Sequence, residues 1–165
     1  MKIYSDKNVF DMALDRIRYL FDEFENMMVC ISGGKDSTIV FNLCKMIARE
    51  KNKLPLKVLF LDQEAEWQLV VDHVREIMND PDVEPYWIQC PILLKNATSI
   101  GEPFLRCWDE GKEWMRDKED IAIKENHYGT ERFHPLWANI LRYYFPKQKA
   151  CFIVGMRAEE SPSRL

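Results

Sequence analysis

Hydrophobic and polar positions along this chain follow two recurring patterns. In residues 9–24 the apolar side chains recur at intervals of three and four, which is typical of an amphipathic helix. Residues 27–32, MMVCIS, form a short continuous apolar run that predicts a buried strand. The same two patterns predict a helix over 37–51, a strand over 56–62 and a helix over 66–78. The first half of the chain is therefore expected to alternate helices and strands.

The second half of the chain resumes this alternation after an interruption. A strand is expected over 85–92 and another over 150–157. Between them, residues 134–145 have helical spacing, with Pro135 well placed in a first turn. The order of elements predicts an α/β fold, a three-layer, mainly parallel sheet with helices on both faces.

The interruption covers residues 93–133, where charges, tryptophans and glycines are scattered without a clear period. We expect this segment to be mostly irregular, with a short helix near residues 110–118. No internal repeat, low-complexity segment or linker divides the chain. Residues 1–165 are therefore expected to form a single domain.

The stretch VCISGGKDSTIV, residues 29–40, carries the strongest candidate chemistry. Its polar centre follows an expected strand and opens an expected helix, so backbone N–H groups and the positive end of the helix converge there. Two glycines permit a sharp turn close to an anion. The residues expected to surround a phosphate are Ser32, Gly33, Gly34, Lys35, Asp36 and Ser37. The pattern matches neither the Walker A loop nor GxGxxG.

The segment SGGKDS resembles the PP-loop of the ATP pyrophosphatase superfamily, and the most similar branch is the phosphoadenosine phosphosulfate (PAPS) reductase family. FLDQEAEW and VGMRAEESPSRL match two further motifs of that family in order and spacing. The resemblance covers nearly the whole chain and implies an adenine nucleotide alpha hydrolase-like fold. It also leaves open that residues 1–165 are the N-terminal part of a longer architecture.

The resemblance implies roles for the matching positions. Residues that would bind the nucleotide are Ser32, Gly33, Gly34, Lys35, Asp36, Ser37, Asp62, Gly155, Arg157, Glu160 and Ser161. Residues that would carry catalysis are Lys35, Arg157 and Arg164, although ion pairs with Glu159 and Glu160 are an alternative role for the two arginines. Residues that would hold Mg²⁺ are Asp36, Asp62 and Glu64. The acidic pair Asp62 and Glu64 suits a metal-bound triphosphate better than a metal-free sulfonucleotide.

Three functions are compatible with this resemblance. The main expectation is an enzyme that binds ATP and cleaves its α–β phosphate bond, transferring AMP to an acceptor chosen by residues 93–133. A second is a nucleotide-binding regulatory module that acts with a partner, for which the resemblance offers a ParB-like protein. A third is PAPS reduction. The reductase Glu-Cys-Gly segment is absent before Leu165, so reduction would need a cysteine from elsewhere.

Composition narrows these expectations further. The net charge of −4 and pI of about 5.5 do not indicate nucleic-acid binding through bulk charge. No apolar run is long enough for a membrane helix, and the N-terminus lacks a signal-peptide core, so a cytoplasmic location is expected. The five cysteines contain no CxxC pair, so neither zinc nor an iron–sulfur cluster is indicated. Cys107, in a polar region, is the cysteine with the best prospect of reactivity.

Overall fold

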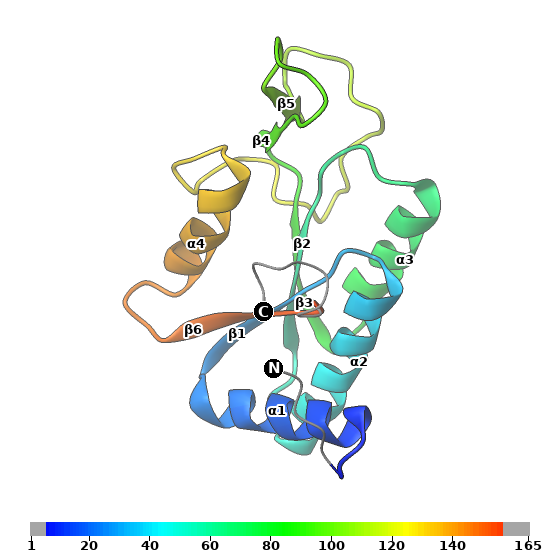
Figure 1. Ribbon diagram of the computed structural model, residues 1–165, viewed down its shortest axis with the longest axis vertical. Coiled ribbons are helices and arrows are strands. Elements are labelled where there is room, and N and C mark those ends of the chain that lie inside the picture. The colour runs from blue at the N-terminus through cyan, green and yellow to red at the C-terminus, as the bar shows by residue number, and fades with distance from the viewer. Residues whose placement is uncertain (1–5, 157–165) are drawn as a thin grey trace.

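A four-stranded sheet and four helices form most of the structure, a computed structural model that describes residues 6–156 (Figure 1). The strands of the sheet are β1 (Asn26–Cys30), β2 (Leu56–Leu61), β3 (Val83–Ile88) and β6 (Ala150–Val154). The helices are α1 (Val9–Glu23), α2 (Lys35–Glu50), α3 (Gln68–Met78) and α4 (Phe133–Tyr144). The four helices begin and end within two residues of the expected ranges.

The sheet has the order β3–β2–β1–β6, and each neighbouring pair of strands is parallel. Side chains along β1 alternate between two hydrophobic cores: Val29 joins the core with α1, α2 and α3, whereas Met28 and Cys30 join the core with α4. The strands are therefore covered on both faces, as their continuous apolar runs require. Figure 1 shows α2 and α3 on one side of the sheet and α4 on the other. The predicted α/β class with helices on both faces is confirmed.

The chain changes direction across the sheet at β1. From β1 it passes through α2 to β2 and then through α3 to β3, and it returns on the other side of β1 as β6. The carboxyl ends of β1 and β6 therefore flank a topological switch point. In open parallel sheets, ligands bind in the crevice at such a point.

The segment between β3 and α4 is mostly irregular, as expected, but its strands and the expected short helix differ from the sequence-based prediction. The strand expected over 85–92 is divided between β3 and β4 (Ile92–Lys95), which pairs antiparallel with β5 (Phe104–Cys107) in a separate hairpin. The short helix expected near 110–118 is wrong, because those residues form turns and bends. There the Met115 N–H donates to the distant Glu64 carboxylate, at 3.1 Å, in place of a helical carbonyl. A tertiary contact thus replaces local helix formation.

Among the helices of residues 6–156, none combines the length and the apolar character needed to cross a bilayer.

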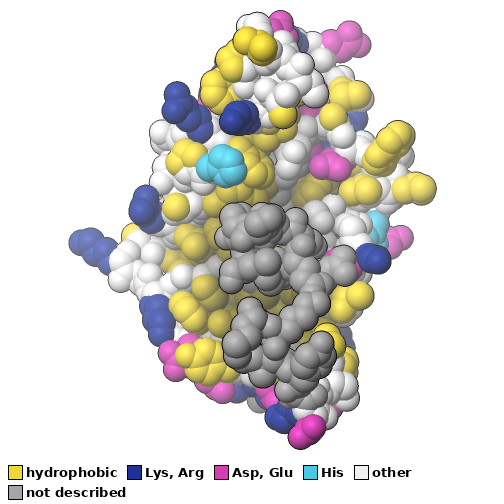
Figure 2. Space-filling view, viewed as in Figure 1, with side chains coloured by type: hydrophobic (Ala, Val, Ile, Leu, Met, Phe, Trp, Pro, Cys, Tyr) yellow, Lys and Arg dark blue, Asp and Glu magenta, His cyan; other side chains and the backbone are white. Residues whose placement is uncertain are grey.

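Residues 132–156, which include α4 and β6, hold four Lys and Arg side chains and no Asp or Glu. Figure 2 shows Lys and Arg side chains along the edge of the molecule outside α4. These residues carry four positive charges in an acidic chain, and one of them, Lys149, is paired with Glu23 at 2.9 Å.

Candidate functional site

A pocket of about 250 Å³ lies at the topological switch point, beyond the carboxyl ends of β1, β2 and β6. The residues that line it are Cys30, Ile31, Ser32, Ser37, Phe60, Leu61, Gln63, Glu66, Trp137, Val154, Gly155 and Met156. Ser32 of the glycine loop (residues 32–34) and Ser37 in the first turn of α2 form one wall, and α4 contributes Trp137 opposite. The structure therefore brings the predicted phosphate loop to the place where a parallel sheet binds ligands.

The loop owes its shape to Gly33 and to the Ser37 hydroxyl. Gly33 has a φ of +70°, and a Cβ there would lie 2.5 Å from Cγ1 of Val70 on α3. The Ser37 hydroxyl donates to the Gly34 carbonyl at 2.9 Å and accepts from the Ser32 N–H at 3.1 Å. Ser37 is buried, so its main role in this structure is to close the loop, whereas Ser32 is exposed at the pocket.

The N-terminus of α2 points its positive end at this loop. Gly34 is the N-cap and makes no side-chain cap, and the first helical hydrogen bond runs from the Thr38 N–H to the Gly34 carbonyl. N–H groups of a helix's first turn have no intrahelical acceptors, and they attract anions. Lys35 is the first helical residue and is exposed, and Asp36 follows it half-buried.

Gly155, which follows β6, lines the pocket and lies against the first turns of α2. A Cβ at this position would lie 3.1 Å from the Asp36 carbonyl oxygen and 3.2 Å from Cγ2 of Val40. A glycine therefore allows the end of β6 to approach the first turn of α2. Gly155 and Met156 are the last residues of the C-terminal motif that the structure describes. Arg157, Glu160, Ser161 and Arg164 lie outside the described residues.

Asp62 has a different environment from the one expected of a metal ligand. Its side chain is fully buried, and its Oδ2 accepts from the Trp87 Nε1–H and the Gln89 Nε2–H, each at 2.8 Å. Both carboxylate oxygens also accept from Nη2 of Arg116, and Oδ1 accepts from the Glu64 N–H at 2.9 Å. A carboxylate has about four lone-pair sites, so these donors saturate Asp62.

The Glu64 carboxylate also accepts hydrogen bonds from donors within the protein. Its carboxylate accepts from the backbone N–H groups of Trp108 and Met115, and the Trp108 indole donates to the Asp62 carbonyl at 2.9 Å. In this arrangement Asp62 and Glu64 do not fit a magnesium site, because their oxygens already hold the segment after β5 onto the sheet. Within residues 6–156, no three His, Cys, Asp or Glu side chains are grouped to hold a metal. Of the three expected ligands, Asp36 alone lies beside the glycine loop, in the first turn of α2.

Glu66 is a pocket residue that the sequence did not single out. Burial, and secondly the Asp62 carboxylate, raise the pKa of Glu66, while Arg116 acts in the opposite direction. Its position in an acidic stretch at the start of a helix has the pattern of an ordinary solvated residue, so local sequence offered little signal. An acid with a raised pKa inside a pocket is a candidate for proton transfer or for recognising a ligand donor.

The opposite wall of the pocket is apolar and aromatic. Trp137 is half-buried and packs edge-on against Phe152, with ring centroids 5.4 Å apart. Met156 after β6 also lines the pocket, whereas the Phe60 side chain lies in the core with α2 and α3 on the other face of the sheet. Such a wall suits a flat ring more than a second phosphate, since aromatic and apolar side chains stack on planar groups.

The five cysteines are all thiols whose pKa is raised by burial. The pKa of Cys107 rises to about 11, with further contributions from nearby carboxylates, so this residue lacks the thiolate character of a nucleophile. Cys30 lines the candidate pocket, but its thiol also has a strongly raised pKa.

Comparisons with known proteins leave the family of this chain open. No protein-family model matches the chain, and no solved structure matches it. The chain is similar to the uncharacterized protein YbdN of Escherichia coli (strain K12), with 29% identity over 171 residues. The match covers 99% of this chain and 42% of YbdN, so the chain spans about two fifths of that relative's length.

Proposed function

We propose that this chain binds ATP or a related adenine nucleotide, with its phosphates on the glycine loop and its base against the aromatic wall. The observation that carries the proposal is the pocket at the switch point, where Ser32 and Ser37, on either side of Gly33, Gly34 and Lys35, lie opposite an apolar wall. The resemblance to PP-loop ATP pyrophosphatases supports adenine and an adenine nucleotide alpha hydrolase-like fold. The Lys and Arg side chains along the edge beside α4 would add attraction for an anionic nucleotide.

The reaction we propose is cleavage of the α–β phosphate bond. An acceptor oxygen attacks the α-phosphorus, the bond from that phosphorus to the bridging oxygen breaks, and pyrophosphate leaves with the electron pair. Lys35 and the first turn of α2 would stabilise the charge that develops on the leaving pyrophosphate. Arg157 and Arg164 belong to this proposal as further positive charges. No step is assigned to Mg²⁺, because Asp62 and Glu64 do not fit it as arranged.

Binding is tested by calorimetry with ATP on the wild type and on Lys35→Ala. A hydrogen bond between charged groups contributes about 1.5–3 kcal/mol, so loss of Lys35 should weaken binding by roughly ten- to a hundredfold. Lys95→Ala is a matched control, since Lys95 is an exposed lysine on the β4–β5 hairpin. Equal affinity of the wild type and Lys35→Ala would overturn the proposed phosphate site.

Cleavage is tested separately with ATP labelled at the α-phosphate and a panel of acceptors. The proposal predicts that labelled AMP moves to an acceptor and that an equal amount of pyrophosphate is released. Lys35→Ala should abolish both products, and Lys95→Ala should retain them. ATP binding without pyrophosphate from any acceptor would refute the enzyme and retain the nucleotide site.

ATP binding without pyrophosphate release would instead fit a nucleotide-binding regulatory module. Asp62 and Glu64 serve as internal hydrogen-bond acceptors, which favours a module that binds ATP or PAPS without turning it over. Such a module would act with a partner, and a ParB-like protein is the partner to test by native mass measurement. PAPS reduction would need a cysteine from another chain or segment, because the thiols of this chain have raised pKa values. Sulfite formed from PAPS and reduced thioredoxin would reveal it.

A further inference from the structure

The turn after β2 brings Glu66 to the pocket of about 250 Å³ at the switch point, called the switch-point pocket below. The Ala65 N–H donates to the Gln63 carbonyl at 2.7 Å, which closes a three-residue turn around Glu64. Glu64 has a φ of +67°, a conformation that is costly for a residue other than glycine and that is often retained at functional sites. With this turn the Glu64 carboxylate reaches the segment after β5, whereas Gln63 and Glu66 line the switch-point pocket.

The Glu66 carboxylate is an accessible hydrogen-bond acceptor that lacks a donor. The residue is half-buried, and no N–H or O–H group of residues 6–156 donates to its side chain. In the same part of the chain, the side-chain N and O atoms that are buried without a partner are Nε and Nη1 of Arg116, so both Glu66 oxygens remain accessible. A half-buried carboxylate has lost part of its hydration, so a ligand that donates hydrogen bonds to it is favoured.

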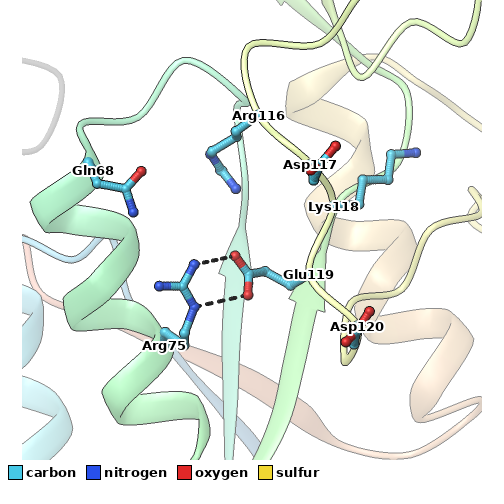
Figure 3. A pocket seen from close by; sticks show the side chains of 7 residues that line it. All are labelled: Gln68, Arg75, Arg116, Asp117, Lys118, Glu119 and Asp120. Carbon is cyan, nitrogen blue, oxygen red and sulfur yellow. Dashed lines mark hydrogen bonds and ion pairs between the residues drawn. The ribbon is translucent and has the colours of Figure 1, made fainter.

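Arg75 and Arg116 belong to a different pocket. That pocket, of about 270 Å³, lies between α3 and the segment that follows β5. Figure 3 shows Arg75 paired with Glu119 there and Arg116 extending toward the same space, and Nη2 of Arg116 donates to both oxygens of Asp62. By contrast, among the described residues that line the switch-point pocket, Glu66 has the sole charged side chain. A second anionic group in that pocket would therefore meet Glu66 without a neighbouring cation in the described lining.

We propose that Glu66 accepts hydrogen bonds from the ribose hydroxyls of the bound nucleotide and excludes a nucleotide that carries a 3′-phosphate. This inference rests on the proposed function, because it takes an adenine nucleotide as the ligand. With the phosphates on the glycine loop and the base against Trp137, the ribose lies between them, in the pocket that Glu66 lines. The two oxygens of a carboxylate can accept from two adjacent hydroxyls. A 3′-phosphate would replace one donor by a group of like charge, so the site selects ATP over PAPS.

Calorimetry with ATP, 3′-deoxy-ATP and 3′-phospho-ATP tests this role of Glu66 on the full chain. The three probes differ only at the 3′ position, so they share the contacts of the base and the triphosphate. The wild type should bind 3′-deoxy-ATP roughly tenfold more weakly than ATP, because a hydrogen bond to a charged group is lost. It should bind 3′-phospho-ATP more weakly still, because like charges then face each other across a partly desolvated contact.

Two variants of Glu66 separate its charge from its role as an acceptor. Glu66→Gln keeps the size and an acceptor oxygen but removes the charge, so the affinities for ATP and 3′-phospho-ATP should approach each other by roughly tenfold. Glu66→Ala removes the acceptor, so ATP and 3′-deoxy-ATP should bind equally. Glu102→Gln is the matched control, because Glu102 is exposed between β4 and β5 and its loss changes the net charge by the same amount. This control should keep both differences of the wild type.

The outcomes distinguish a failure of this inference from a failure of the proposed function. Equal affinity of the wild type for ATP and 3′-phospho-ATP would overturn the role of Glu66 and retain the nucleotide site. Differences between the probes that persist unchanged in both Glu66 variants would do the same. If none of the three probes binds, the proposed nucleotide site is itself refuted, and the role of Glu66 is refuted with it.

Discussion

Gly33→Ala tests whether α3 packs on the glycine loop as closely as the structure has it. The substitution places a non-glycine residue at a φ of +70°, which costs roughly 1–2 kcal/mol. It also places a Cβ 2.5 Å from Cγ1 of Val70 and 3.2 Å from Cγ2 of Val74. Both neighbours are stiff β-branched residues in a core helix, so overpacking adds roughly 1–3 kcal/mol. We expect the free energy of unfolding to fall by roughly 2–5 kcal/mol.

Gly129→Ala separates the backbone cost of a positive φ from the cost of overpacking against α3. Gly129 has a φ of +71°, but a Cβ there would meet nothing within 4 Å, so only the backbone cost of roughly 1–2 kcal/mol applies. Urea unfolding measures both variants, and the Val70→Ala background should move the cost of Gly33→Ala toward that of Gly129→Ala, because it removes the 2.5 Å contact and leaves the one with Val74. If Gly33→Ala costs no more than Gly129→Ala in the wild-type background, the loop does not contact α3 as described.

Two further predictions concern titratable groups. Glu66 has a pKa raised above 4.5, so the stability it contributes is present below that pH and is lost as pH rises through the raised value. The midpoint of urea unfolding should therefore fall over this pH range in the wild type, and Glu66→Gln should make the fall smaller. The same pH profile for both proteins would contradict the prediction. At pH 7.5 a disulfide reagent should modify the folded protein far more slowly than the urea-unfolded chain, because burial raises the pKa of each thiol. A thiol of the folded protein that reacts as fast as free cysteine would refute this for Cys30, Cys44, Cys90, Cys107 or Cys151.

The glycine loop between β1 and α2 was predictable because its signals are local. A strand, two glycines, a lysine and an amphipathic helix follow one another within about a dozen positions, and neighbouring residues dictate how they fold. The details of Gly33 and Gly155 were not predictable in the same way. Gly33 avoids Val70 and Gly155 avoids the Asp36 carbonyl, and both contacts come from elements distant in the chain.

The hairpin and the tertiary contacts of the irregular segment after it were not predicted, for a related reason. β5 is mostly exposed, with Phe104 and Leu105 among its exposed side chains, so it lacks the buried face that makes a strand recognisable. The residues that follow are held by Glu64, which lies 44 and 51 positions before its partners Trp108 and Met115. No periodic pattern within the segment encodes such contacts.

The sequence by itself determined the α/β class, the four helices and the loop between β1 and α2. A strand buried on both faces needs a continuous apolar run, and a helix that packs through one face needs apolar residues at intervals of three and four. Both patterns are therefore visible in the residues of the element itself. Only the tertiary structure decided what the acidic residues after β2 do. Asp62 and Glu64 have the composition of metal ligands, but Trp87, Gln89 and Arg116 surround Asp62 from 25 to 54 positions away. Whether a carboxylate faces a ligand or an internal donor depends on such distant partners, which adjacent residues do not specify.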